Sequence, residues 1–213
     1  ENLDDLSVQV ALVRPGPIQG KAVHPYVERR QRRREDPSYV IPHDHPLLAE
    51  CLEETLGAII FQEQVLEVAM ALAGFSVGEA EGLRRAMSRK RSQDAIEAHR
   101  ERFFAGAARN GVPEETTEPV FSKINGFASF GFPKSHAAAF GLLAYQSAWL
   151  RHYHPAEYYT ALFNNQPMGF YSLDALGRDA KRNGITIRLP DVSVSDIWCS
   201  VEADAVRIGL GFI

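Results

Sequence analysis

The sequence predicts a mainly α-helical protein, a multi-helix domain with a small α/β tail at its C-terminus. Apolar residues recur at spacings of three and four through the middle of the chain, as on one face of a helix. Only the region after about residue 184 contains the short apolar runs that are typical of strands. Of the 213 residues, 45% are apolar and 23% are charged, which excludes a disordered or collagen-like chain.

Prolines, glycines and capping residues set the ends of the predicted helices. The loop Arg14-Pro15-Gly16-Pro17 ends the first helix, because two prolines and a glycine cannot continue it. Ser76-Val77-Gly78-Glu79 fits a capping box, in which serine and glutamate each bond the other's backbone amide. The predicted helices are 3–13, 46–57, 62–73, 76–91, 92–110, one ending near 126, 135–154, one starting at 155 and ending before 164, and 172–184.

The remaining segments are expected to be loops, strands or short buried connections. The charged run 29–36 precedes Pro37, Pro42 and Pro46, and we interpret it as an exposed loop. The apolar triplet 59–61 suits a short buried segment, and residues 185–189, 197–201 and 205–210 are strand candidates. Because no internal repeat is visible, we expect one helical domain over residues 1–170 and a helix-plus-strand tail over residues 171–213.

Composition restricts the class of protein further. No run of 18 apolar residues occurs, and the chain begins without a basic region followed by an apolar one, so we expect a cytoplasmic protein without membrane contact. Cys51 and Cys199 lie far apart in the sequence and are expected to be buried thiols. His43-Asp44-His45 has no third ligand at a suitable spacing, so no metal-binding residue is predicted.

A basic cluster is the first candidate for a binding site. The net charge is −4, yet five of the eight residues from Arg84 to Arg91 are positive and none is negative. Arg85 and Arg89 lie four residues apart on one helix face, where like charges repel. Guanidinium groups bind phosphate oxygens through two parallel hydrogen bonds, so an anionic partner would remove this repulsion. A solvated basic face is the alternative interpretation.

The second candidate is the start of the helix predicted after residue 134. Lys134, Ser135 and His136 place a lysine, a hydroxyl and an imidazole where free backbone amides and the helix dipole favour an anion. The alternative is that Ser135 only caps the helix. Gln62 and Gln64 can supply amide contacts to a polar ligand, although polar residues are also common in the first turn of a helix. The common signatures of nucleotide hydrolases, esterases and metalloproteases are absent from the sequence.

Together these segments resemble the catalytic alpha subunit of bacterial family C DNA polymerases, the polymerase III group. The matching motifs follow the order of that family along nearly the whole chain. They are Val10-Ala11-Leu12-Val13-Arg14-Pro15-Gly16-Pro17, Phe61-Gln62-Glu63-Gln64, Leu83-Arg84-Arg85-Ala86-Met87, Phe132-Pro133-Lys134-Ser135-His136-Ala137-Ala138-Ala139-Phe140 and Tyr145-Gln146-Ser147-Ala148-Trp149-Leu150. The segment Asn165-Gln166-Pro167-Met168-Gly169-Phe170-Tyr171-Ser172 resembles the error-prone, damage-response branch more than the main replicase.

The resemblance implies the fingers domain of a DNA-directed DNA polymerase, active in DNA replication or error-prone damage-response synthesis. Such a domain binds the incoming deoxynucleoside triphosphate and closes over the primer-template. The implied nucleotide-binding residues are Arg84, Arg85, Arg89, Lys90, Lys134, Ser135 and His136, supported by Arg14, Gln62 and Gln64. Nucleotidyl transfer itself would use magnesium held by the palm, which is missing here. No catalytic residue is therefore assigned, and the chain alone is predicted to be inactive.

The implied partners are primer-template DNA, deoxynucleoside triphosphates and, in the full protein, a sliding clamp and accessory subunits. Two other classes of function stay open: a non-catalytic helical module that binds nucleic acid through a basic helix face, and a structural scaffold. Dependence on a nucleoside triphosphate separates the three. A passive nucleic-acid binder should show no preference for nucleotide, and a scaffold should bind neither.

Overall fold

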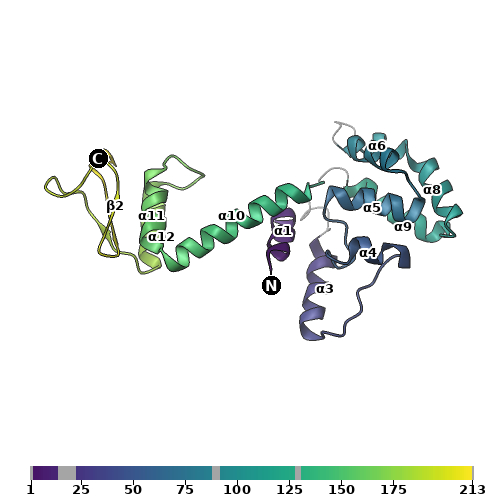
Figure 1. Ribbon diagram of the computed structural model, residues 1–213, viewed down its shortest axis with the longest axis horizontal. Helices are drawn as coiled ribbons and strands as arrows, with labels where there is room; N and C mark the ends of the chain where they lie inside the picture. Colours follow the sequence, from purple (N-terminus) through teal and green to yellow (C-terminus); the bar gives the residue numbers. More distant parts are fainter. Residues whose placement is uncertain (1, 14–22, 88–91, 128–130, 213) are drawn as a thin grey trace. The chain divides into compact units, whose positions relative to one another are not determined.

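The computed structural model describes residues 2–13, 23–87, 92–127 and 131–212 (Figure 1). It is mainly helical, with a small three-stranded sheet near the C-terminus, which confirms the predicted fold class. The chain divides into two compact units, Glu1–Leu142 and Leu143–Ile213. The predicted domain boundary between residues 170 and 171 stays a prediction. None of the described helices has the length and apolar character that a membrane crossing requires.

The first unit is built from short helices around α5. Its described helices are α1 (Leu3–Leu12), α3 (Val23–Glu35), the 3₁₀ helix η1 (Pro46–Leu48), α4 (Ala49–Leu52), α5 (Gln62–Ala73), α6 (Val77–Met87), α7 (Ser92–Glu97), α8 (Arg100–Arg109), α9 (Glu114–Phe127) and the first part of α10 (Lys134–Tyr153). Helix α5 packs against both α6 and α8, and α8 packs against α9. The predicted capping box at the start of α6 is confirmed: the Glu79 amide donates to Ser76 Oγ (3.3 Å), and the Ser76 amide donates to Glu79 Oε2 (2.7 Å).

Two apolar clusters hold this unit together. The larger one joins α5, α6, α8 and α9, and Leu72, Leu83, Phe103 and Phe121 are among its fully buried members. The smaller one brings α1, the segment before α5 and the start of α10 together, and its members are Val8, Ala11, Leu12, Tyr26, Leu56, Ile60, Phe61 and Ala137. Apolar burial thus fixes the first turns of α5 and α10 on a common base.

The interpretation of residues 29–36 as a loop is wrong, because most of this charged run lies in α3. Two kinds of contact explain the helix. Arg32 pairs with Glu28 one turn earlier (2.5 Å), and Arg29 Nη1 donates to the carbonyl of Leu56 (2.6 Å). Arginine is also a good helix former, and no proline or glycine interrupts the run. The sequence reasoning weighted charge as a sign of a loop, whereas here the charges lie on a helix.

Two other predicted helices differ from the structure. The helix predicted over 46–57 ends at Leu52 and is followed by a turn in which the Leu56 amide bonds the carbonyl of Glu53 (3.1 Å). Leu56 and Gly57 then have left-handed backbone angles (φ 54° and 77°), so no helix continues to residue 57. The helix predicted over 92–110 is divided into α7 and α8. There the His99 amide bonds the carbonyl of Ile96, three residues earlier (2.8 Å), and this tight turn interrupts the regular ladder.

The second unit contains the last part of α10, two further helices and the sheet. Its remaining elements are α11 (Pro155–Asn164), α12 (Leu173–Arg182), β1 (Ile187–Arg188), β2 (Ser200–Glu202), β3 (Ala205–Arg207) and η2 (Leu210–Phe212). The strand order is β1-β3-β2, with β1 parallel and β2 antiparallel to β3. Tyr159, Phe163, Ala180 and Val206 are buried between these elements. The strands occur where the sequence predicted them but are shorter.

Candidate functional site

The first turns of α5 and α10 meet, although they lie about 70 residues apart in the sequence. The Gln62 amide donates to the carbonyl of Phe132 (3.0 Å). The Lys134 amide donates to both carboxylate oxygens of Glu63 (3.1 and 3.0 Å). A carboxylate therefore occupies the start of α10, where the sequence predicted an anion, and this anion belongs to the chain itself.

Gln64 organises the turn that leads into α5. Its side chain is 4% exposed, and Oε1 accepts the amides of Ile60 (2.9 Å) and Phe61 (3.1 Å). Nε2 donates to Thr55 Oγ1 (2.6 Å). Because the chain itself engages both ends of the carboxamide, Gln64 supports the position of α5 and has little capacity left for a ligand. Contact between Gln64 and a nucleotide stays a prediction.

The neighbouring Gln62 helps to set how closely the segment before α10 approaches α5. A Cβ atom on Gly131 would lie 2.9 Å from Gln62 Cγ, which is closer than real Cβ contacts come. Only glycine therefore fits at position 131 without a shift of the Gln62 side chain. The supporting role predicted for Gln62 is untested, and its backbone rather than its side chain carries the hydrogen bond to Phe132.

Arg84 and Arg85 lie on α6 and share one carboxylate. Arg84 Nε and Nη2 donate to the two oxygens of Glu81 (2.8 and 2.7 Å), and Arg85 Nε donates to one of them (3.3 Å). The hydrogen bond from Arg84 is the main cause that lowers the pKa of Glu81 to about 2. The same contact raises the pKa of Arg84, and the charge of Glu63 contributes to this rise. Glu63 therefore acts electrostatically on both clusters that the sequence singled out.

Lys134 is also paired. Its Nζ lies 2.5 Å from Glu54 Oε2, and this hydrogen bond raises the pKa of the lysine. The pair lines a cavity of about 430 Å³ together with three more glutamates, Glu50, Glu63 and Glu67. Burial raises the pKa of Glu67, and the neighbouring carboxylates of Glu54 and Glu63 add to the effect. The side chain of Lys134 thus points into an acidic cavity.

His136 and Ser135 occupy the exposed side of the first turn of α10. The imidazole lies between two aromatic rings, with centroid distances of 5.2 Å to Phe132 and 4.5 Å to Phe140. Tilted and edge-to-face ring contacts of this kind favour the observed orientation of the imidazole. Three of the predicted residues, Arg14, Arg89 and Lys90, lie outside the described part of the chain.

Sequence reasoning missed the three carboxylates that partner the predicted cations and helix start, Glu54, Glu63 and Glu81. Glu81 had a readable signal, because it precedes Arg84 by three residues and Arg85 by four, the spacings at which side chains pair on a helix. Glu54 and Glu63 had none, since their partner Lys134 lies 80 and 71 residues further along the chain.

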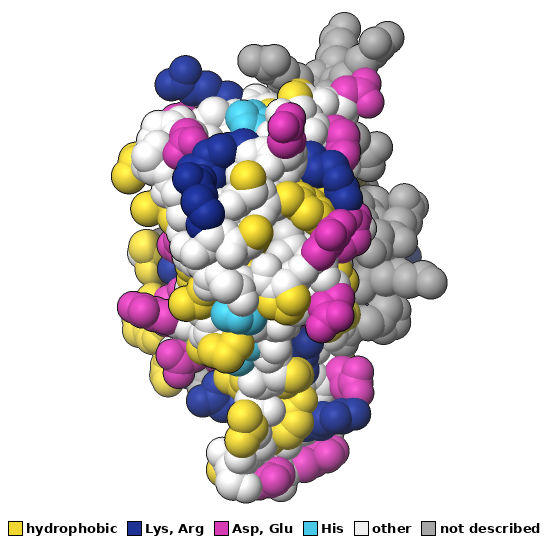
Figure 2. Space-filling view, turned by 90° about the vertical axis from the view of Figure 1, so that its right-hand side faces the viewer, with side chains coloured by type: hydrophobic (Ala, Val, Ile, Leu, Met, Phe, Trp, Pro, Cys, Tyr) yellow, Lys and Arg dark blue, Asp and Glu magenta, His cyan; other side chains and the backbone are white. Residues whose placement is uncertain are grey.

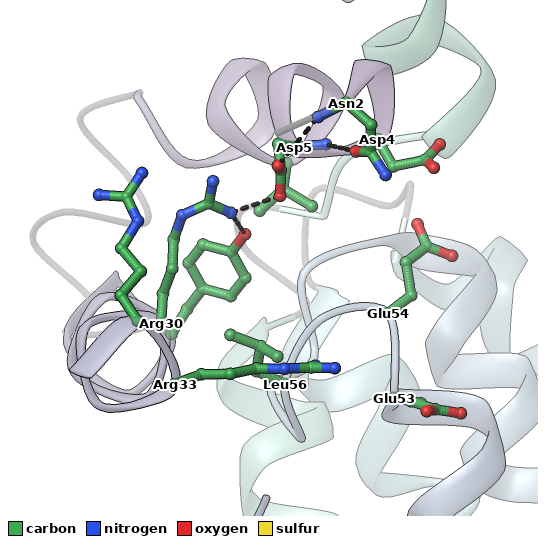
Figure 3. A pocket seen from close by; sticks show the side chains of 11 residues that line it. Asn2, Asp4, Asp5, Arg30, Arg33, Glu53, Glu54 and Leu56 are labelled. Carbon is green, nitrogen blue, oxygen red and sulfur yellow. Dashed lines mark hydrogen bonds and ion pairs between the residues drawn. The ribbon is translucent and has the colours of Figure 1, made fainter. Parts of the chain in front are cut away.

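A second charged cavity, of about 420 Å³, lies between α1 and α3 (Figure 3). Arg30 contacts the carboxylate of Asp5 and donates to the hydroxyl of Tyr26 (2.9 Å). The hydrogen bond from Arg30 lowers the pKa of Asp5. Arg33 extends toward the side of the cavity that carries Glu53 and Glu54 (Figure 3). Positive and negative groups are thus mixed in this cavity.

Charges of both signs are also mixed on the face drawn in Figure 2, where Lys and Arg side chains lie among Asp and Glu side chains. Within the described ranges, no group of three or more His, Cys, Asp or Glu residues is arranged to hold a metal ion. Asp44, in the histidine-containing loop, pairs instead with Lys123 (2.7 Å). Cys51 and Cys199 are free thiols, half-buried and buried respectively.

Comparison with known proteins relates this arrangement to one family. The family model for the bacterial DNA polymerase III alpha subunit finger domain matches residues 1–111. Proteins named error-prone DNA polymerase are similar over nearly the whole chain. The one from Corynebacterium diphtheriae is 46% identical over 98% of the chain, that from Dechloromonas aromatica 48% over 99%, and that from Corynebacterium glutamicum 49% over 98%.

The chain spans about a fifth of the length of these relatives, 20%, 20% and 19% respectively. The family match and the relatives agree with the order of motifs along the sequence, which confirms the resemblance. The chain therefore belongs to the bacterial DNA polymerase III alpha subunit finger-domain family, and it is similar to proteins named error-prone DNA polymerase.

Proposed function

We propose that this chain forms the fingers of a DNA-directed DNA polymerase, where it binds the incoming deoxynucleoside triphosphate and closes over the primer-template for nucleotidyl transfer. Membership of the finger-domain family and the shared name of the relatives support this proposal. The full protein acts in DNA replication or in error-prone synthesis after DNA damage. Closure of the fingers positions the reacting groups and excludes water.

The pairing of Arg84 and Arg85 with one carboxylate carries the proposal. Two adjacent guanidinium groups that converge on the two oxygens of Glu81 have the geometry that also suits phosphate oxygens. Helix α6 packs on α5, whose first turn contacts the start of α10, and the charge of Glu63 reaches Arg84. Glu63 would therefore act electrostatically on a triphosphate bound by Arg84 and Arg85, and the same glutamate contacts the helix start that carries Lys134, Ser135 and His136.

Magnesium is proposed for the full polymerase and is assigned to another part of it. The carboxylates near the arginines do not fit such a site, because Glu81 is engaged by two guanidinium groups and Glu63 by the amide of Lys134. Carboxylates elsewhere in the longer protein would hold the ions that assist phosphoryl transfer. Primer-template DNA, a sliding clamp and accessory subunits are proposed partners, and the cytoplasm is the proposed location.

The test is replacement of Arg84 or Arg85 by alanine in the intact polymerase. Loss of one charge-assisted contact to the triphosphate should lower kcat/KM for nucleotide by about ten- to hundredfold, with a smaller change in primer-template binding. Arg178→Ala is the matched control. Arg178 is exposed on α12 in the second unit and pairs with Asp174 one turn away (2.9 Å), so this change removes an equal charge and an ion pair of similar spacing from another helix.

The outcome also separates the alternative function. If Arg84→Ala weakens DNA binding but leaves nucleotide use intact, the chain is a nucleic-acid-binding module whose basic helix face contacts phosphates. If neither property changes, the polymerase-fingers assignment of this site is wrong and the helices act as a scaffold.

A further inference from the structure

Glu81 differs from Glu79, the other carboxylate of α6, in what it contacts. Among the described residues, its recorded hydrogen bonds are those from Arg84 and Arg85. Glu79, two residues earlier on the same helix, is instead held by the amide of Ser76 (2.7 Å) and by Arg102 Nε (2.7 Å). Glu79 therefore has a structural function at the helix start. In the part of the chain that the structure describes, Glu81 has no recorded hydrogen bond to a helix cap or to a distant segment.

We infer that Glu81 is an exchangeable counter-ion for the nucleotide site: it positions Arg84 and Arg85 while the site is empty and is displaced by the triphosphate. This inference rests on the proposed function, because it assumes that both arginines bind the nucleotide. It assigns Glu81 as a positioning residue, which contacts both arginines proposed to bind the nucleotide and affects how tightly the nucleotide binds.

The geometry supports exchange rather than permanent pairing. The Glu81 side chain is 32% exposed, that of Arg84 40% and that of Arg85 73%, so solvent reaches all three groups. Ion pairs of this exposure contribute little net stability, because water screens them and the side chains must be ordered. A ligand with a higher charge and more oxygens can therefore replace the Glu81 carboxylate at the two arginines with little loss of folding free energy.

The free site needs such a counter-ion for a second reason. Arg84 and Arg85 are neighbours in the sequence, and their like charges would otherwise drive the two guanidinium groups apart. Glu81 lies three and four residues earlier on α6, the spacing at which it reaches both. Because Glu81 is tethered beside them, its effective concentration is high, so a singly charged anion from solution competes poorly. A triphosphate, which also gains contacts through base and sugar, displaces it.

The same tether makes Glu81 a competitor of the nucleotide. A triphosphate must displace its carboxylate, and any part of Glu81 that stays nearby repels the phosphate charges. Removing the charge while keeping the shape should therefore tighten nucleotide binding. Closure and the chemical step do not involve this contact, so kcat should change little.

The experiment is Glu81→Gln in the intact polymerase, with steady-state kinetics for a correct deoxynucleoside triphosphate. We expect KM to fall about two- to fivefold, the range that an exposed ion pair implies, with kcat within about twofold of its original value. Glu81→Asp, which keeps the charge, should restore most of the original KM. Glu101→Gln is the charge-matched control, because Glu101 is exposed on α8 and no hydrogen bond or ion pair is recorded between it and Glu81, Arg84 or Arg85, and it should leave KM unchanged.

Two further variants make the result decisive. In an Arg84→Ala background, Glu81→Gln should lower KM less than it does alone, because its main partner is gone. Glu81→Ala removes the side chain beyond Cβ and should also lower KM. It replaces Glu81→Gln as the test if the glutamine variant folds poorly. An unchanged or raised KM in both Glu81→Gln and Glu81→Ala, with Arg84→Ala still impaired, would overturn the counter-ion role alone. If Arg84→Ala and Arg85→Ala leave nucleotide use intact, the proposed function itself fails.

Discussion

Replacement of Gln64 by alanine should destabilise the first unit by about 2 to 3 kcal/mol. The change removes the acceptor of two amides, those of Ile60 and Phe61, which belong to residues only 3% and 0% exposed. It also removes the donor to the buried Thr55 hydroxyl. Each buried polar group left without a partner costs about 1 to 3 kcal/mol, so the two amides alone suggest about 2 to 6 kcal/mol.

The lower end of that range is expected, because water can partly replace the lost side chain. Gln64 lines the cavity of about 430 Å³ beside Lys134, and this cavity has polar walls that can orient a water molecule. The destabilisation should also disturb the candidate site. Gln64 stabilises the turn just before Gln62. The backbone amide of Gln62 donates a hydrogen bond to the carbonyl of Phe132, in the segment before α10.

Urea unfolding of the 213-residue chain, followed by far-ultraviolet circular dichroism, measures the effect as a difference in the free energy of unfolding. Gln62→Ala is the control, because Gln62 contributes its backbone amide to the contact with Phe132, and alanine retains that amide. It should change the free energy of unfolding by less than about 0.5 kcal/mol. A loss below about 1 kcal/mol for Gln64→Ala, or one equal to the control, would refute the buried network.

Three other predictions concern packing, pH and activity. Gly106→Ala should cost about 1 to 3 kcal/mol, since its Cβ would lie 1.9 Å from the carbonyl oxygen of Ala73. Gly126→Ala, whose Cβ meets nothing within 4 Å in a helix of the same unit, should stabilise by about 0.5 to 1 kcal/mol; equal urea midpoints for the two variants would contradict this. The hydrogen bond from Arg102 is the main cause that lowers the pKa of Glu79 from 4.5 to about 2, so its stabilising effect is complete above pH 4.5 and is lost as pH falls towards 2. Glu79→Gln should flatten the dependence of unfolding free energy on pH in that window, and an unchanged slope would count against the pair. The purified 213-residue chain should not extend a primer with magnesium and all four nucleotides, and measurable extension would show that it holds its own catalytic carboxylates.

Local sequence signals were sufficient for much of the helical structure. The capping box of Ser76 and Glu79, the apolar spacing along α5 and the proline at the start of α11 each act within one or two turns, so the starts of these helices could be read directly. The same reasoning failed for α3, where charge density suggested a loop. That helix is stabilised in part by the bond from Arg29 to the carbonyl of Leu56, 27 residues away, which no local pattern contains.

The candidate site likewise combines features that the sequence predicted with features that only the tertiary structure reveals. The sequence by itself determined the mainly helical fold, the family, and the residue types that can bind a triphosphate, because these depend on short motifs and on their order along the chain. Only the tertiary structure decided which charges are paired. Glu63 reaches the amide of Lys134 across 71 residues and Glu54 reaches its ammonium group across 80, because apolar burial of Phe61 and Ala137 brings the two helix starts together. Hydrophobic packing acts between segments without regard to their separation in sequence, so the partners of the predicted cations could not be read from spacing alone.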